Sequence, residues 1–373
     1  MDVKNTKRVF LGFDMGGTLA KLVYAEKDTV FCKESLDILN FILSTSHYGS
    51  SGIRDSHLEV SIPELGKVYF IRFASNRISG AIDLIKKKNL HIGIEILYAV
   101  GGGTHKYKAL FEKELGVKIV HLDELGSIVK GMVYLLQHVE DECYTIENVA
   151  NEDGSTIKIN KNFGTDNDLF PFLVVNIGTG VSILKVTKAN DIERISGTAL
   201  GGGTFLGLCR LLTNSKKFDE ALDLAATGDA NSVNMLVKDI YSGECKGLGS
   251  DIKHFNLSGD LTASFFAKNI MISNPNENIR KKVSDSDISR ALCIMIAQNV
   301  TQIALLNAKL HNVFKVFFTG NFLRHNPIAS RTIVQNMRRW SELGNLNIEI
   351  LFFRREGYLG AFGALIQGIE RLK

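Results

Sequence analysis

Two short glycine-containing segments of this chain have the residue types needed to surround the phosphate groups of a nucleotide. The first contains Asp14, Gly16, Gly17 and Thr18, and the second contains Gly178, Thr179 and Gly180. Each follows a short apolar run that is typical of a buried strand, and each leads into another such run. Glycines let backbone N–H groups approach an anion closely, and a neighbouring hydroxyl group adds a further donor. The pair therefore predicts a nucleotide held between two similar halves of the chain.

Glu124 is the candidate for the general base of a phosphoryl transfer. It follows a predicted strand and lies in the first turn of a predicted helix that Asp123 could cap. A kinase acting on a hydroxyl group needs one carboxylate to deprotonate that group, with Mg²⁺ and cations to balance the phosphoryl charge. Asp14 could hold the Mg²⁺ ion through water, and Lys21 or Arg194 could supply positive charge. From its position alone, Glu124 could equally serve to complement the helix dipole.

Three further glycine-bearing strand ends could contribute to the same site. They are the runs 101–103 and 201–203, and the pair Gly320 and Asn321. Taken singly, each glycine run could as well allow a helix to pack closely on a sheet. Together with the two hairpins, these strand ends are better explained by one shared cleft, with phosphates held by the hairpins and by helix N-termini. The sequence has neither a GxxxxGKS/T motif nor a GxGxxG motif after a strand, so it lacks the P-loop and dinucleotide-binding signatures.

Strands alternate with helices in both halves of the sequence, which indicates layers of α and β structure. A hydrophilic interval rich in Asn, Asp and Gly separates the halves. We therefore expect an N-terminal lobe over 7–169 and a C-terminal lobe over 170–373, acting as one unit around the cleft. Apolar spacing predicts a helix over 77–88, with Ser75 as its cap, and a long helix from 284 to about 310.

Composition and charge are those of a globular protein with a sizeable core, since 45% of the 373 residues are hydrophobic and 23% are charged. The formal net charge of +4 is too small to argue for nucleic-acid binding. The five cysteines are dispersed, without a CxxC pair or zinc spacing, as in a reducing compartment. The N-terminus lacks the apolar segment of a secretory signal, and no apolar stretch approaches the roughly 20 residues that span a bilayer. We therefore expect a cytoplasmic protein with no membrane span and no nucleic-acid partner.

Six ordered segments together resemble the eukaryotic-type (type II) pantothenate kinases of the actin/hexokinase-like ATPase superfamily. The resemblance extends from about residue 9 to residue 372 and includes both glycine hairpins and the surroundings of Glu124. The segments are 12–22, 122–125, 176–183, 197–208, 320–324 and 356–361. The resemblance implies an α/β, two-lobed, duplicated actin/hexokinase-like ATPase fold with the nucleotide in the cleft between the lobes.

The resemblance also implies that the chain uses ATP and Mg²⁺ to phosphorylate pantothenate to 4′-phosphopantothenate, the first step of coenzyme A biosynthesis. Glu124 then matches the general base, and Asp14, the candidate metal-binding residue, lies in the segment that resembles the first phosphate motif. The matching nucleotide positions are Asp14, Gly16, Gly17, Thr18, Lys21, Gly178, Thr179, Gly180, Gly320 and Asn321. The matching positions for pantothenate or an acyl-CoA are Gly102, Gly103, Thr179, Ser182, Arg194, Ala263 and Trp340.

Regulation and assembly follow from the same resemblance. Acetyl-CoA or another acyl-CoA would be a feedback inhibitor that occupies the nucleotide cleft, so that ATP and the inhibitor exclude each other. A homodimer would form largely through the long helix of the C-terminal half. Trp340, the only tryptophan, matches an aromatic position near the dimer-related acyl-CoA site.

A few positions depart from the family pattern. Thr179 stands where serine is usual, and its hydroxyl preserves the contact while its methyl group crowds the pocket slightly. Thr104 replaces the alanine that follows the glycine triplet, and Phe265 and Phe266 replace small residues. These changes bear on substrate fit and on the strength of feedback. Two alternatives stay open, namely a sugar kinase of the same superfamily and a catalytically silent subunit of a heteromeric kinase.

Overall fold

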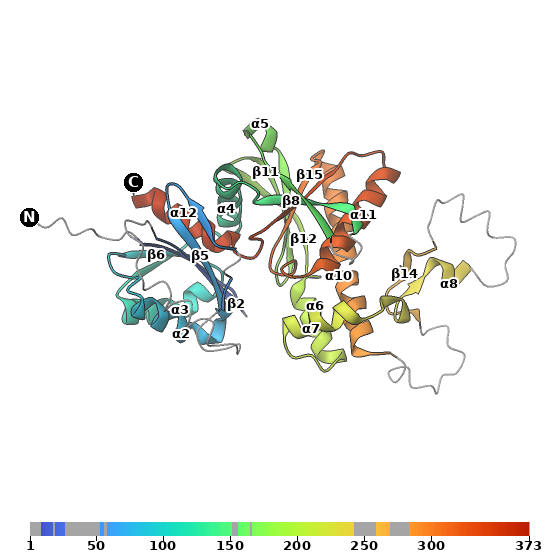
Figure 1. Ribbon diagram of the computed structural model, residues 1–373, viewed down its shortest axis with the longest axis horizontal. Helices are drawn as coiled ribbons and strands as arrows, with labels where there is room; N and C mark the ends of the chain where they lie inside the picture. The colour runs from blue at the N-terminus through green and yellow to red at the C-terminus, as the bar shows by residue number, and fades with distance from the viewer. Residues whose placement is uncertain are drawn as a thin grey trace, which may run out of the picture.

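The computed structural model describes residues 9–17, 19–26, 53–55, 58–150, 156–164, 166–241, 259–268 and 283–372. Thr18, one of the predicted phosphate contacts, lies outside these residues. The described chain forms two seven-stranded mixed sheets and one small two-stranded sheet. In Figure 1 the two large sheets belong to two lobes that lie side by side.

The first sheet has the strand order β3-β5-β2-β1-β6-β7, with β4 paired to β5. Strands β5, β2 and β1 are antiparallel neighbours, and β1, β6 and β7 are parallel. The strand bounds are β1 Val9–Met15, β2 Leu19–Glu26, β3 Ile53–Arg54, β4 Val60–Ile62, β5 Gly66–Ala74, β6 Ile96–Val100 and β7 Lys118–His121. The β1–β2 connection is the first predicted glycine hairpin.

The second sheet has the strand order β12-β11-β10-β15-β16-β8-β9. Strands β12, β11 and β10 are antiparallel neighbours, and β10, β15 and β16 are parallel. The strand bounds are β8 Cys143–Ala150, β9 Thr156–Lys161, β10 Phe172–Ile177, β11 Val181–Lys188, β12 Asp191–Thr198, β15 Lys315–Thr319 and β16 Glu349–Phe353. Three antiparallel strands followed by two parallel ones thus occur in the same order in both sheets. The predicted duplicated α/β fold is therefore confirmed.

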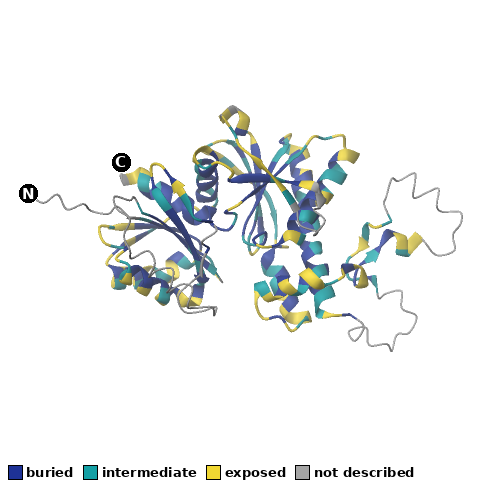
Figure 2. Ribbon diagram, in the orientation of Figure 1, coloured by how far each residue is buried: buried dark blue, intermediate teal, exposed yellow. Residues whose placement is uncertain are grey.

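Helices cover these sheets with faces that the apolar spacing predicts. The buried face of α2, for example, consists of Ile78, Ala81, Ile82, Leu84 and Ile85. In the first lobe the helices are α2 Ile78–Lys87, α3 Gly103–Leu115 and α4 Glu124–His138; in the second they are α5 Asp166–Leu169, α6 Gly202–Leu212, α7 Phe218–Thr227, α8 Val237–Tyr241, α10 Asp285–His311 and α11 Pro327–Leu343. Buried residues are concentrated on the strands and on the helix faces turned toward them (Figure 2).

Two segments cross between the lobes, so the elements do not separate strictly at residue 169. The hairpin β8–β9 precedes that residue but pairs with β16 in the second sheet. The last helix, α12 Leu359–Leu372, packs against α4, β1 and β6 in the first lobe. Figure 1 shows this C-terminal helix, in red, beside the blue strands of the N-terminal half. The chain therefore connects the lobes twice.

The long helix α10 begins and ends close to its predicted limits. Ser284 caps it, because its hydroxyl oxygen accepts from the Asp287 N–H group while the Asp287 carboxylate accepts from the Ser284 N–H group. By length and composition α10 could cross a membrane, which the sequence analysis did not expect of any segment. In this structure, however, 61% of its most apolar window is buried, and it packs against α6, α7 and α11.

Candidate active site

Asp14 and Lys21 form an ion pair at the first glycine hairpin. They are direct partners across β1 and β2, and the Lys21 Nζ atom lies 2.6 Å from Asp14 Oδ2. Partners in an antiparallel pair project from the same face of the sheet, which brings these side chains together. Both side chains are largely buried. A hydrated Mg²⁺ ion bound by one carboxylate and by nucleotide phosphates fits this arrangement, provided that it shares Asp14 with Lys21.

The turn of this hairpin is held by Ser75. The Gly16 N–H group donates to the Leu19 carbonyl oxygen, and the Ser75 hydroxyl donates to the Gly16 carbonyl oxygen at 2.6 Å. Gly17 is exposed and has open space around its Cα atom. Ser75 was predicted to cap the following helix. That prediction is wrong, since Ser75 opens a 3-10 turn without a side-chain cap and its hydroxyl group serves the hairpin instead.

Glu124 is the first residue of α4, and the charges of Asp14 and Lys21 act on its carboxyl group. The Asp123 carboxylate caps the helix as predicted, accepting from the Gly126 N–H group at 2.5 Å. Although the Glu124 side chain is solvent-accessible, surrounding protein atoms partly desolvate it and raise the pKa of its carboxyl group. The negative charge of Asp14 raises this pKa further, and the positive charge of Lys21 opposes the rise. A carboxylate with a raised pKa is a better proton acceptor at neutral pH.

The first glycine triplet serves packing at two positions and is open at the third. Gly101 has φ +87°, and a Cβ atom there would lie 2.6 Å from the Met15 carbonyl oxygen. A Cβ atom on Gly103 would lie 2.8 Å from the same oxygen, whereas Gly102 has no neighbour within 4 Å. Only Gly102 therefore leaves space for a ligand. Thr104, a departure from the family pattern, is buried, and its hydroxyl donates to the Val100 carbonyl oxygen at 3.0 Å.

The second hairpin is docked against the other glycine run. The Gly202 and Gly203 N–H groups donate to the carbonyl oxygens of Gly178 and Thr179, at 2.8 and 2.9 Å. Within the hairpin, the Gly178 N–H group donates to the Gly180 carbonyl oxygen at 2.9 Å. These two N–H groups of the glycine run therefore already have hydrogen-bond acceptors within the protein. Phosphate contact here would come from the hairpin itself.

Gly320 and Asn321 follow the end of β15, beside the second hairpin. Gly320 has φ +108°, and a Cβ atom there would lie 2.4 Å from the Ile177 carbonyl oxygen at the end of β10. The Glu356 carbonyl oxygen accepts from the Gly320 N–H group, at 3.0 Å, and from the Thr319 hydroxyl. Burial raises the pKa of the Glu356 carboxyl group to about 7. The structure thus brings together the second hairpin, the second glycine run and the Gly320 turn.

Ser182 and Arg194 lie near each other beside this hairpin, on β11 and β12. Ser182 is the cross-strand partner of Gly197, and a Cβ atom on Gly197 would lie 2.8 Å from Arg194 Nη2. The guanidinium group therefore extends along β12 toward Ser182. Arg194 is exposed. A serine hydroxyl and an arginine together suit a carboxylate ligand.

Trp340 and Ala263 are not brought to the hairpins within this chain. Trp340 lies on α11 and packs against the hydrophobic core of the second lobe. Ala263 is exposed on β14 Thr262–Ser264, which pairs with β13 Met235–Leu236. In Figure 1 this small sheet lies beyond α10, away from both large sheets. The role near a dimer-related acyl-CoA site stays a prediction for both residues.

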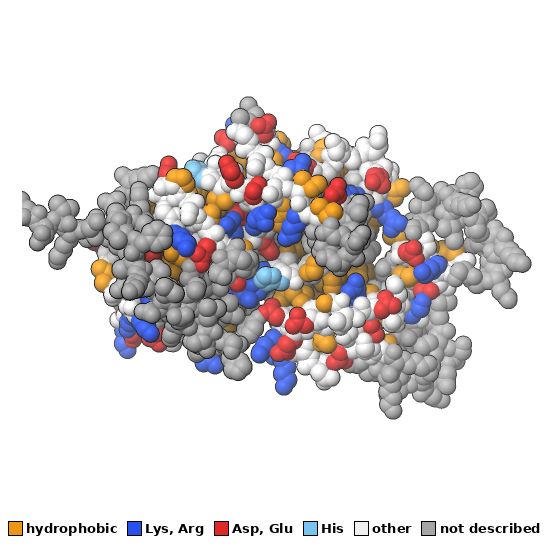
Figure 3. Space-filling model, viewed as in Figure 1, with side chains coloured by type: hydrophobic (Ala, Val, Ile, Leu, Met, Phe, Trp, Pro, Cys, Tyr) orange, Lys and Arg blue, Asp and Glu red, His pale blue; other side chains and the backbone are white. Residues whose placement is uncertain are grey.

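Several charged side chains form ion pairs where the two lobes meet, and most of them were not singled out from the sequence. Arg324 stands in a segment quoted for the resemblance, but Arg72, Glu142, Asp219 and Arg355 carried no motif. Figure 3 shows Lys and Arg side chains toward the middle of the visible face, close to Asp and Glu side chains. Isolated charged residues in strands and loops usually face solvent, so only the fold reveals that these are partners.

With this geometry in place, comparison with known proteins places the chain in a family. The Fumble family matches residues 10–367. Pantothenate kinase 1 of Arabidopsis thaliana is 35% identical over 95% of this chain and 84% of its own length. The chain belongs to the Fumble family, the family of the type II pantothenate kinases. Its sequence resemblance to these kinases is therefore confirmed.

Other relatives of this Fumble-family chain are longer proteins. The 4′-phosphopantetheine phosphatase of Mus musculus and pantothenate kinase 2 of Arabidopsis thaliana are each 35% identical to it, over 99% and 95% of the chain. The chain spans only 42% and 38% of their lengths. Among solved structures, a glucokinase from Balamuthia mandrillaris in complex with glucose is 12% identical, with a TM-score of 0.42 over 98% of this chain and 94% of its own.

Proposed function

We propose that the protein phosphorylates pantothenate at the expense of ATP and yields 4′-phosphopantothenate. The observation that carries this proposal is the placement of Glu124 beside the Asp14–Lys21 pair, where its pKa is raised. Transfer of a phosphoryl group to a hydroxyl requires a base, a carboxylate for the metal ion and a cation. Glu124 on α4 and Asp14 and Lys21 on the hairpin are suited to these three roles. The relatives named pantothenate kinase support pantothenate as the acceptor.

In the proposed reaction, Glu124 accepts the proton of the pantothenate hydroxyl as that oxygen forms a bond to the γ-phosphorus of ATP. The bond between this phosphorus and the bridging oxygen breaks, and ADP leaves with the electron pair. Lys21 supplies positive charge beside the transferring group, and Asp14 would hold Mg²⁺, which neutralises phosphate charge when bound. Ser182 and Arg194 bind the pantothenate carboxylate, and Thr179 contacts the substrate from the second hairpin.

Regulation and assembly belong to the same proposal. Acetyl-CoA or another acyl-CoA occupies the nucleotide cleft as a feedback inhibitor, and a homodimer brings Trp340 and Ala263 to its acyl portion. The exposed side chains of Leu306 and Leu310 on α10, 63% and 78% accessible, are available for a dimer contact. We also propose a cytoplasmic location. An acetyl-CoA titration should raise the apparent KM for ATP, and light scattering should give the mass of two chains.

The deciding experiment is a phosphate-transfer assay on the purified chain alone. Labelled ATP is supplied with pantothenate and, in parallel, with N-acetylglucosamine or glucose. Transfer to pantothenate alone supports the proposal, while transfer to a sugar favours the sugar-kinase alternative. Folded chain that transfers phosphate to none of them would overturn the proposal and favour a silent subunit of a heteromer.

A phosphatase function is tested in the same preparation. The mouse relative is named for 4′-phosphopantetheine hydrolysis, but the match covers 42% of that protein. Its name therefore does not carry over by itself. Release of inorganic phosphate from 4′-phosphopantetheine, without transfer to pantothenate, would replace the kinase proposal with a phosphatase.

A further inference from the structure

Four charged side chains form a ring of alternating sign where the two lobes meet. Asp55 and Arg72 belong to the first lobe, and Asp219 and Arg324 belong to the second. Each arginine lies near one aspartate of its own lobe and one of the other lobe. The distances are Arg72 Nε–Asp55 Oδ2 3.6 Å, Arg72 Nη1–Asp219 Oδ2 3.8 Å, Arg324 Nη1–Asp55 Oδ2 3.5 Å and Arg324 Nη2–Asp219 Oδ1 3.9 Å.

All four contacts are too long for good hydrogen bonds, for which a charged N–H donor lies about 2.7–2.9 Å from the oxygen. The ring is nevertheless mostly buried, with Arg72 and Arg324 side chains 13% and 7% exposed. Arg72 Nε and Arg324 Nη1 are buried without a hydrogen-bond partner among the described residues. Buried guanidinium N–H groups left in this state are costly, so the arrangement favours a nearby conformation that satisfies them.

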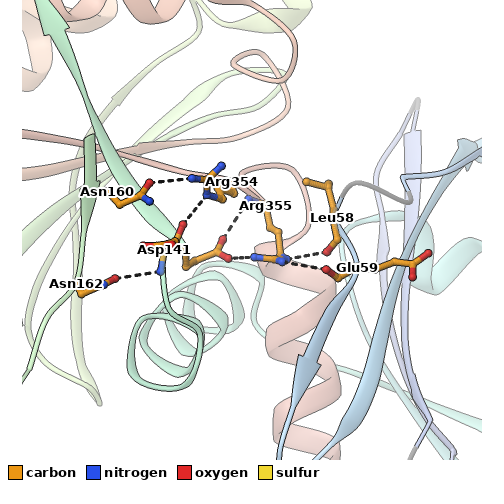
Figure 4. Close-up of polar contacts among 8 residues, drawn as sticks. Leu58, Glu59, Asp141, Asn160, Asn162, Arg354 and Arg355 are labelled. Carbon is orange, nitrogen blue, oxygen red and sulfur yellow. Dashed lines mark hydrogen bonds and ion pairs between the residues drawn. The ribbon is translucent and has the colours of Figure 1, made fainter. Parts of the chain in front are cut away.

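In the adjacent contact between the lobes, by contrast, the Arg355 side chain makes its hydrogen bonds. The Arg355 Nη1 and backbone N–H groups donate to the Glu142 carboxylate of the second lobe, and Nε donates to the Leu58 carbonyl oxygen of the first at 2.9 Å. Figure 4 shows Arg355 extending toward the segment of Leu58 and Glu59. Tyr358 links this contact to the ring, since its hydroxyl group donates to Asp55. A contact that makes its hydrogen bonds, beside one that lacks them, is compatible with a hinge at the first and movement at the second.

Each half of the ring is also attached to one half of the candidate site. Arg72 is the cross-strand partner of Lys21, which is in turn the partner of Asp14, so the three side chains form a row on one face of the first sheet. Arg324 follows the Gly320 turn of the second lobe directly, and its N–H group donates to the Asn321 carbonyl oxygen. A relative movement of the lobes would therefore change the ring and the site together.

We propose that Asp55, Arg72, Asp219 and Arg324 form an electrostatic latch that is loose in the structure described here and forms cross-lobe hydrogen bonds when the lobes close on a nucleotide. Closure of about 1 Å at this point suffices to bring the two cross-lobe pairs, Arg72–Asp219 and Arg324–Asp55, to the distance of charge-assisted hydrogen bonds. Because the ring carries two positive and two negative charges, it has no net charge to attract a separate anion. The inference rests on the proposed use of a nucleotide.

The test is a double-mutant cycle on nucleotide binding, with Arg72→Gln, Asp219→Asn and the double variant. Calorimetry with the non-hydrolysable analogue AMP-PNP and Mg²⁺ gives the Kd of each. Asp219→Asn should disturb the fold less than Arg72→Gln, because 35% of the Asp219 side chain is exposed. Each single change should weaken binding roughly threefold to tenfold, and the double variant should be no weaker than either single variant.

Asp223→Asn is the matched control, since it removes the same charge from an exposed position one turn further along α7. It should leave the Kd unchanged. Small-angle scattering should show the wild-type chain becoming more compact with the analogue bound, and Asp219→Asn doing so less. Additive effects in the cycle, an equal effect of Asp223→Asn, or no compaction of the nucleotide-bound wild type would each overturn the latch. Failure of the proposed function looks different, since coupling and compaction would persist without phosphate transfer to pantothenate.

Discussion

Glu124 differs from an ordinary glutamate at a helix N-terminus in the charges around it. We expect Glu124→Gln to lower turnover of pantothenate by roughly two to four orders of magnitude, because the hydroxyl loses its proton acceptor. Nucleotide affinity should stay close to that of the wild type, since the phosphate-binding hairpins are unchanged. Steady-state kinetics and calorimetry measure the two quantities. Asp123→Asn, which retains an oxygen to cap the helix, is the control and should keep most of the activity.

The pH dependence of the reaction should respond to Lys21. Its positive charge lowers the pKa of Glu124, so Lys21→Met should raise that pKa further. A higher pKa keeps the base protonated up to a higher pH, and the acidic limb of the kcat/KM profile should therefore move upward. Lys130→Met, which removes the same charge from α4 where Lys130 pairs with Glu370, should not move the limb. If the acidic limb of Lys21→Met is unchanged or moves downward, Glu124 is not the general base.

The sequence identified functional side chains whose partners lie nearby in the chain. It missed contacts between residues that are far apart in the sequence and that only the fold brings together. Asp14 and Lys21 are joined by a hairpin whose register follows from its short turn, and the cap by Asp123 depends on three neighbouring residues. Ser75 was assigned to its own helix because its bond to Gly16 spans 59 positions in the sequence. The local pattern contains no signal for such a contact.

Among the elements, the crossing of α4 and α12 positions Glu124 relative to β1. A Cβ atom on Gly363 would lie 1.8 Å from the Ser127 carbonyl oxygen, so the helices touch backbone to backbone. We expect Gly363→Ala to lower the free energy of unfolding by about 1–3 kcal/mol or more and to reduce turnover, because α4 must shift. Gly207→Ala, at an exposed position of α6 where nothing lies within 4 Å of an added Cβ atom, should instead be neutral or stabilising by up to about 1 kcal/mol. Urea denaturation compares the two, and equal effects would contradict this account of the crossing.

Helix and strand limits followed from the sequence wherever one periodic pattern determined them. The spacing of apolar residues and the serine cap located α10, and the two β-hairpins were visible as paired apolar runs. The sequence did not show in the same way which lobe each element belongs to. The pairing of β8 with β16 and the packing of α12 on β1 join segments some two hundred or more positions apart, which no local pattern encodes.

For the whole molecule, the buried contact of Arg355 with Glu142 should be essential to the joining of the lobes. The Glu142 side chain is fully inaccessible, and burial raises its pKa while Arg355 opposes the rise. Arg355→Met leaves this carboxylate buried without its cation. We expect a loss of about 3–5 kcal/mol in the free energy of unfolding at pH 8, the usual cost of breaking such a pair.

This loss should depend on pH with a definite sign. Without Arg355 the pKa of Glu142 in the folded state rises further above its value in the unfolded chain, so the folded variant binds a proton more readily. Its stability is then greatest below the unfolded pKa and falls as the pH rises toward the folded one. The difference from the wild type should accordingly be smaller at pH 5 than at pH 8 in urea denaturation. Adding Glu142→Gln should restore part of the stability at pH 8, because a neutral amide replaces the unpaired charge. A loss that is equal at both pH values, or that grows when Glu142→Gln is added, would mean that the lobes are not joined through this charge pair.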